Sequence, residues 1–360
     1  MGQRLFISKN LLRPGAWIVR WLRNRLPVGV IILLLLSAAL NYIEGAIGGL
    51  PVWISAYLDA LANFSTAFLS IFLEAAPFLL LGVLASGIVE LFFTREEILR
   101  WSPRDPLLQA AAGSLIGLFF PAGEVGTIPL ARRLLLKGMP VTMGVSMLLA
   151  APVLNLIVIA STYAAFGPGF VFWGRLGLSA GIAVLTALIF TSSKQAQAAL
   201  RQDKDVQEKS PSMPAANGRA LTTRIKQAML LAVDEFFEFG SYLVLGSLLA
   251  ALIHTVVPLP PLAAAGQGPV LPVAAWMALS VLLSSSASMD AFIALPSAGS
   301  SSAGSILAFL LLGPVLDIKN VVMYLRVFKP AAVLRLGLIV LLLTFIFSVL
   351  INIIVPAGWF

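Results

Sequence analysis

Long apolar runs separated by short polar segments make up most of the chain. From residue 64 onward six runs exceed 20 residues, and two others have 14 and 12 residues. About 20 apolar residues in a helix cross the hydrocarbon core of a bilayer, which is about 30 Å thick. The pattern predicts an all-α polytopic membrane protein. In order, the runs are Phe64–Phe93, Leu107–Phe120, Val141–Phe166, Phe170–Phe190, Ile225–Val257, Pro272–Leu283, Ile306–Phe328 and Ala332–Val355.

A further apolar run, Val28–Ile43, follows an N-terminal segment that carries six basic residues. A signal peptide has the same order of charged and apolar regions, but it ends in a small-residue cleavage site, which is not evident here. We therefore interpret the run as an uncleaved N-terminal transmembrane helix, with the N-terminus in the cytoplasm.

Two landmarks recur at similar spacing in the two halves of the chain. The segment FLEAAPFLLLGVL aligns without a gap with FFEFGSYLVLGSL, which places Glu74 opposite Glu238. Further along, APVLN, which ends at Asn155, matches GPVLD, which ends at Asp317. Two landmarks in register predict an internal duplication.

A polar segment separates the two halves. It is rich in Lys, Gln, Ser and Pro and has no apolar periodicity, so we expect a flexible cytoplasmic linker. The predicted parts of the chain are the basic N-terminal segment with the first transmembrane helix (residues 1–50), the first repeat (51–191), the linker (192–224) and the second repeat (225–360).

The 14-residue run in the first repeat is too short to cross the bilayer, because 14 helical residues rise only about 21 Å. If it did cross, Arg132 and Arg133 would lie on the opposite side from the arginines that precede the run, against the positive-inside rule. We therefore predict a re-entrant hairpin, with prolines and glycines at its turn. Its parts are the arm Leu107–Phe120, the turn Pro121–Gly126 and the return arm Thr127–Lys137, with Pro121, Gly126 and Pro129 as structural residues of the tip.

The second half repeats this arrangement from the other side. Residues 256–268 contain no Lys or Arg, so we expect them to be external, with Pro272–Leu283 entering from outside and turning at SSSASMD. Each repeat then has three transmembrane helices and one re-entrant helical hairpin, the repeats are inverted, and the C-terminus is external. Crossing hairpins would instead give parallel repeats. Inverted repeats whose broken elements meet at the midplane are typical of secondary transporters.

Composition excludes several other functions. The net charge of +8 comes from basic residues beside the apolar runs, where they set orientation, so we expect no nucleic-acid binding. The chain has no cysteine and one histidine, His254, which excludes thiolate and histidine-based metal sites. Nucleotide-binding motifs and hydrolase signatures are missing, so we predict neither an enzyme nor a cofactor.

Four motifs resemble one family. PAGEVGTIP followed by LARRLLLKG, then LLAAPVLN, SMDAFIA and LLGPVLDIKN, are similar to motifs of the bacterial predicted-permease family that includes the ArsP organoarsenical efflux permeases. The resemblance runs from about Phe64 onward and implies the fold above and permease activity. In that family the first tip usually reads Pro-x-Cys-x-Cys-Gly-x-x-Pro, and here Gly123 and Val125 occupy the cysteine positions. Ser286 is near the position of a second-tip cysteine. Because trivalent arsenic is bound through thiolates, the resemblance does not imply that substrate.

Four carboxyl groups are the main candidates for binding an ion or a substrate. Glu74 and Glu238 lie in the middle of apolar runs, where an ionisable group faces either a cavity used in coupling or a helix that it joins by hydrogen bonds. Glu124 and Asp290 lie at the predicted hairpin tips, where the alternative is that each caps the returning helix.

Other polar and small residues are weaker candidates. Asn155 and Asp317 follow a proline, where unwound backbone can coordinate an ion, but an ion pair with the lysine two residues later is the simpler role for Asp317. Ser286 and its neighbouring serines line a polar path or supply turn hydrogen bonds. The aligned Gly82 and Gly246 permit close helix packing.

These features predict an inner-membrane permease that moves a small solute or metalloid-type compound by alternating access, coupled to protons or ions. A passive channel and a lipid-phosphate flippase are the alternatives. The expected partners are membrane lipids and the solute, and a homo-oligomer is compatible with the sequence. The candidate substrate or ion site contains Glu74, Glu124, Glu238, Asp290, Ser286, Asn155 and Asp317.

Overall fold

The computed structural model describes residues 52–120, 122–192, 199–200, 221–257 and 268–355, together with Ala39 and Tyr42. The predicted N-terminal transmembrane helix, most of the predicted linker, and Pro121 lie outside these residues. The chain divides into two compact units, Met1–Thr66 and Ala67–Phe360. In its described part the first unit contributes the beginning of helix α2 (Val52–Phe92), and the second unit contains the remaining helices.

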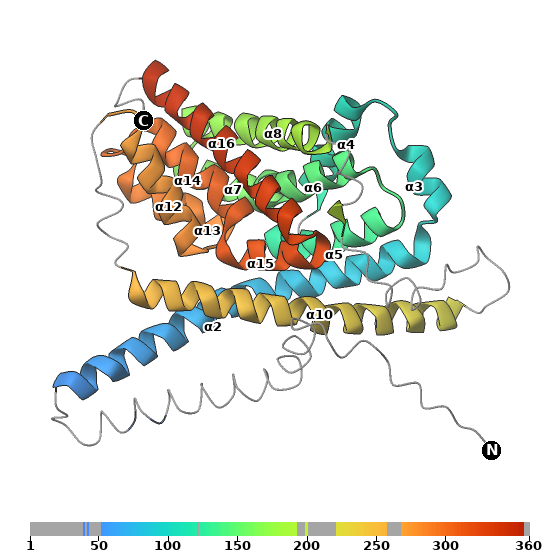
Figure 1. Ribbon diagram of the computed structural model, residues 1–360, viewed down its shortest axis with the longest axis horizontal. Coiled ribbons are helices and arrows are strands. Elements are labelled where there is room, and N and C mark those ends of the chain that lie inside the picture. The colour runs from blue at the N-terminus through green and yellow to red at the C-terminus, as the bar shows by residue number, and fades with distance from the viewer. Residues whose placement is uncertain are drawn as a thin grey trace. The chain divides into compact units, whose positions relative to one another are not determined.

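All regular structure in the described part of the chain is helical (Figure 1). In the first half, α2 is followed by α3 (Arg95–Trp101), α4 (Pro106–Phe119), α5 (Gly123–Leu136), α6 (Val141–Leu154), α7 (Leu156–Phe166) and α8 (Phe170–Thr191). The second half contains α10 (Leu221–Val256), α12 (Leu271–Leu283), α13 (Ala287–Ala294), the short 3₁₀ helix η3 (Leu295–Ser297), α14 (Ala303–Leu316), α15 (Ile318–Val327) and α16 (Pro330–Ile354).

Six helical stretches of the described chain are long and apolar enough to cross a membrane, and they match the six long runs of the sequence. They are Ser55–Phe92, Val141–Phe166, Phe170–Thr191, Ile225–Val256, Ala303–Val327 and Pro330–Ile354. The two short runs correspond to the shorter apolar helices α4 and α12. The all-α, multi-pass class predicted from the sequence is confirmed.

Two of the six stretches are broken at equivalent positions. Asn155 separates α6 from α7, and Asp317 separates α14 from α15, both with extended backbone. A proline within the last turn of α6 and of α14 removes one helical hydrogen bond, and the polar side chain then caps the next helix. Asn155 Oδ1 accepts from the Val158 amide at 3.0 Å, and Asp317 Oδ1 accepts from the Asn320 amide at 2.7 Å.

The two halves use the same pattern of helix contacts. Helix α4 packs on α6 as α12 packs on α14, and α6 packs on α8 as α14 packs on α16. Two equivalent contacts join the halves: α5 of the first half packs on α15 of the second, and α13 of the second half packs on α7 of the first. The second segment of each broken stretch therefore lies against the other half of the protein.

The first predicted hairpin turn is shorter than expected. Helix α5 begins at Gly123, whose φ is +61°, so Gly126 lies inside the helix and not in the turn, and Pro129 lies in the return helix. Gly126 instead allows α5 to touch α2, since a Cβ atom placed on Gly82 would collide with the Gly126 backbone. A Cβ on Gly246 would lie 2.7 Å from Lys319 Cα, so both aligned glycines serve close helix packing, as predicted.

Helices α2 and α10 run in opposite directions where they touch. Leu79 lies near Gly240, and Gly87 lies near Ala228, so residue numbers rise along one helix as they fall along the other. The hydrogen bond from Ser86 to Glu235 lies between these two contacts. The aligned segments of the two halves are therefore antiparallel to each other.

Candidate functional site

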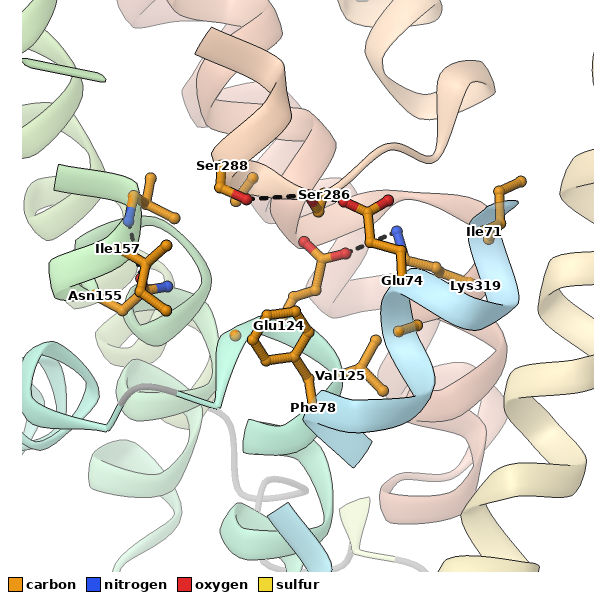
Figure 2. Close-up of a pocket in the computed structure, with 14 residues that line it drawn as sticks. Ile71, Glu74, Phe78, Glu124, Val125, Asn155, Ile157, Ser286, Ser288 and Lys319 are labelled. Carbon is orange, nitrogen blue, oxygen red and sulfur yellow. Dashed lines mark hydrogen bonds and ion pairs between the residues drawn. The ribbon is translucent and has the colours of Figure 1, made fainter. Parts of the chain in front are cut away.

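A pocket of about 30 Å³ lies where the broken helices and the start of α5 and α13 converge (Figure 2). A buried water needs roughly 10–15 Å³ by the same measure, so the pocket has room for only a very small molecule or ion. Its polar lining residues are Glu74, Glu124, Asn155, Ser286, Ser288 and Lys319, and its apolar walls include Ile71, Phe78, Val125 and Ile157. Glu74, Asn155 and Lys319 lie well inside helical stretches that are long and apolar enough to cross a membrane.

Lys319 is the central cation of the pocket. Its side chain is 2% exposed and its Nζ lies 2.7 Å from Glu124 Oε1. It also pairs with Asp317 and donates to the carbonyl oxygens of Ser284, at 2.9 Å, and Ser285, at 3.2 Å. The ion pair that the sequence predicted between Asp317 and Lys319 is confirmed. One ammonium group therefore joins α15, the start of α5 and the segment before α13.

The serine segment before α13 presents its hydroxyl groups to the acids. Ser286 donates to Glu74 and lies 3.1 Å from the Ser288 hydroxyl, and Ser285 donates to Asp290 Oδ1. Ser284 is the one described non-glycine residue with a positive φ, at 47°. A positive φ costs energy in a residue other than glycine, and it persists where surrounding contacts hold the backbone. Here Lys319 Nζ donates a hydrogen bond to the Ser284 carbonyl oxygen.

Arg175 on α8 is a second buried cation beside the pocket, and the sequence analysis missed it. Its Nη1 donates to Thr162 Oγ1 at 2.6 Å, and its Nη2 donates to the Ala287 carbonyl oxygen at 2.8 Å. Asp290 and Glu124 are the acids that act on it electrostatically. An arginine in the middle of the apolar segment FVFWGRLGLSAGIAV was the signal that could have identified it.

Acids outnumber cations in this region. Glu74, Glu124, Asp290 and Asp317 can carry four negative charges, whereas Lys319 and Arg175 carry two positive charges. Glu124 Oε2 and Asp290 Oδ2 are buried without a hydrogen-bond partner among the described residues. Within the described residues no three acidic or histidine side chains are placed to hold a metal ion. The region can therefore take up protons at these two unpaired carboxylate oxygens, of which that of Glu124 belongs to a residue that lines the pocket.

Comparison with known proteins identifies the family. Residues 60–353 match the family model described as ArsP_1, predicted permease. The chain belongs to this permease family. It is 38% identical over 273 residues to the UPF0718 protein YcgR of Bacillus subtilis, an alignment that covers 76% of this chain and 91% of the relative. It is 33% identical over 279 residues to a Streptococcus mutans protein named as a proposed subunit of a two-component membrane permease complex, covering 74% and 88% of the two chains. No solved structure matches the chain.

The permease brings most of the predicted site residues together. Glu74, Glu124, Asn155 and Ser286 line the pocket, and Asp317 and Asp290 adjoin it through Lys319 and Ser285. Asp290 does not cap α13, because the N-cap of that helix is Ser286 and Asp290 lies one turn further on.

Glu238, the remaining predicted site residue, does not line the pocket. It pairs with Arg326 of α15, and its Oε2 lies 3.7 Å from Arg132 Nη1 of α5. Arg132 also lies over the Phe239 ring, with 5.8 Å between its guanidinium carbon and the ring centroid. The permease thus separates the two aligned glutamates: Glu74 faces the pocket, and Glu238 belongs to a second charged region.

Proposed function

We propose that the protein is a secondary transporter that moves a small solute by alternating access, with carboxyl groups of the central pocket taking up and releasing protons. The observation that carries the proposal is the excess of acids over cations in and beside the pocket, together with the buried, unpaired oxygens of Glu124 and Asp290. Ionisable groups at this depth in a membrane protein are expensive, and they mark ion or substrate pathways.

The helix arrangement supports inverted repeats. The aligned parts of α2 and α10 run in opposite directions, and the paired contacts of α5 with α15 and of α13 with α7 are those expected when one repeat is turned over against the other. Helices α4 and α12, with 14 and 13 residues, are too short to span about 30 Å, which supports two re-entrant hairpins.

Proton uptake would change the pocket directly. With all acids ionised the region carries two excess negative charges, and neutralising Glu124 would weaken its attraction to Lys319. The bonds from Lys319 to Asp317 and to the serine carbonyls would then hold α15 and the α13 segment together without α5. Protonation would therefore loosen the contact between the two halves at one named pair, which is how a proton gradient would bias the two conformations.

Cysteine labelling tests the proposal without a known substrate. The chain has no cysteine, so a single Ser288→Cys change places one reactive thiol in the pocket. A membrane-impermeant maleimide should label this thiol both in right-side-out vesicles and in inverted vesicles, which expose opposite faces of the protein. A change of pH should raise the labelling rate from one face and lower the labelling rate from the other face. A passive channel would show both rates rising together, and that result would refute alternating access.

A further inference from the structure

A second group of charged side chains, separate from those that line the pocket, lies on α2, α5, α10 and α15; Figure 1 shows these four helices. We define the seam layer as Glu90 on α2, Arg132 and Arg133 on α5, Glu235 and Glu238 on α10, and Arg326 on α15. Four of these residues, Arg132, Arg133, Glu235 and Arg326, are buried. Resting on the function proposed above, we propose that the seam layer is an ionic gate that closes one end of the path to the pocket and opens when the two repeats separate.

The seam layer is connected to the pocket through the same helices. Helix α5 starts at Gly123 beside the pocket, and Arg133 lies ten residues further on, a helical rise of about 15 Å. Helix α15 starts at Ile318, and Arg326 lies eight residues further on, a rise of about 12 Å. A shift of either helix at the pocket therefore moves a charge in the layer.

Some contacts of the seam layer join the two repeats. Arg133 of the first repeat pairs with Glu235 of the second, and Ser86 Oγ of the first donates to Glu235 Oε2 at 2.5 Å. Arg132 of the first repeat lies 3.7 Å from Glu238 of the second. Separation of the repeats would break these three contacts.

Other contacts lie within one repeat and would survive separation. In the first repeat, Arg133 and Lys137 lie 3.5 Å and 3.2 Å from Glu90. In the second repeat, Glu238 pairs with Arg326. Each side of the seam thus keeps an ion pair of its own after the repeats part. A layer that only held the fold together would have no need of this second set of partners.

The energetics of burial also favour a gate over a fixed support. A buried ion pair stabilises a fold weakly or not at all compared with apolar packing, because desolvation offsets the attraction. An apolar seal loses its whole burial energy when water enters, whereas charges regain hydration. An ionic seal is therefore suited to a surface that must alternate between a closed state and an open, hydrated one.

The test compares two changes, each of which neutralises one carboxylate that pairs with Arg133. Glu235→Gln weakens a contact across the seam, and Glu90→Gln weakens a contact within one repeat. Each is combined with Ser288→Cys in the full chain, and a maleimide that cannot cross the membrane reports access to the pocket. Ser102→Cys, at the C-terminal end of α3, the short helix that follows α2, marks the vesicle face on the seam side.

Glu235→Gln should raise labelling of the pocket thiol from the seam side by about tenfold, since a hydrogen bond to a charged group is lost from the closed state only. Glu90→Gln should leave that rate within about twofold of the parent protein. Ser86→Ala removes the hydroxyl group that donates to Glu235 across the seam and leaves every charge in place. It should give a smaller rise in the same direction, which keeps the test usable if Glu235→Gln folds poorly.

Equal acceleration by the Glu235 and Glu90 variants would overturn the gate, because the effect would then come from general loosening. No acceleration by either seam variant would overturn it too. The proposed function fails on a different result, in which the two labelling rates of the parent protein rise together when the pH is changed.

Discussion

Replacing Lys319 by methionine should destabilise the protein strongly. Methionine has a similar length but no charge, so the packing of α15 against Gly246 is retained while every polar contact of the ammonium group is lost. The change leaves Glu124 and Asp317 without their cation and leaves the carbonyl oxygens of Ser284 and Ser285 without a donor.

The size of the effect follows from these contacts. Removing one partner of a buried ion pair costs about 3–5 kcal/mol, because the remaining charge is left buried and uncompensated. Lys319 serves two acids, so we expect the upper end of this range for Lys319→Met. Adding Asp317→Asn should recover about 1–2 kcal/mol, since one orphaned charge disappears and asparagine caps a helix as well as aspartate does. Asn155 already performs this capping at the equivalent break in the first half.

The assay is the thermal unfolding midpoint of detergent-purified protein, read as an apparent value because membrane proteins of this size rarely refold on cooling. Lys329→Met is the matched control, because Lys329 is exposed and lies just after α15, at the N-cap of α16. The reasoning fails if Lys319→Met unfolds at the same temperature as the control. It also fails if the Asp317→Asn change lowers the midpoint further in the Lys319→Met background.

Three further predictions concern the pocket, the packing and the topology. In the Ser288→Cys background, Glu124→Gln and Asp290→Asn should each reduce the response of the labelling rates to pH, because an amide cannot take up the proton; an unchanged response in both would exclude these acids as the proton sites. Gly82→Ala should prevent folding, measured as loss of monodisperse protein, because its methyl group would collide with the α5 backbone, whereas Gly177→Ala has open space and should fold normally. Ser102→Cys should be labelled only from the cytoplasm, and labelling from outside would contradict the predicted orientation.

Much of the fold could be predicted because each feature depends on local sequence. The transmembrane stretches follow from uninterrupted apolar runs, and the two helix breaks follow from a proline with a capping Asn or Asp three residues later. The return arm was predicted to begin at Thr127, and α5 begins at Gly123, because Gly126 was interpreted as a turn residue. Gly126 lies in the helix, where its lack of a side chain lets α2 pack against the α5 backbone, so a tertiary contact explains this glycine.

The place of Glu238 could not be predicted, because its partners come from two distant segments. The predicted internal repeat makes it equivalent to Glu74, but basic residues occur on α5 in the first half and not on α13 in the second. Arg132 and Arg326 therefore hold Glu238 in the seam layer, whereas Glu74 faces a serine of the second hairpin segment. Sequence symmetry between repeats indicates equivalent backbone positions, and the charges that differ between repeats decide which contacts form.

This difference in charge has a consequence for the transport cycle. Under the proposed inverted-repeat mechanism one repeat moves against the other, and we expect the second conformation to exchange the contact of α5 with α15 for that of α13 with α7. Beyond Asp290 neither α13 nor α7 has a charged residue, so the exchanged state cannot form ion pairs equivalent to those of the seam layer. The two states therefore differ in energy by the contacts across the seam. We therefore expect the protein with an empty pocket to rest with the seam closed. A ligand or proton shifts such an equilibrium only through its preference for one state. Binding in the central pocket would then have to supply the free-energy difference between the two conformations.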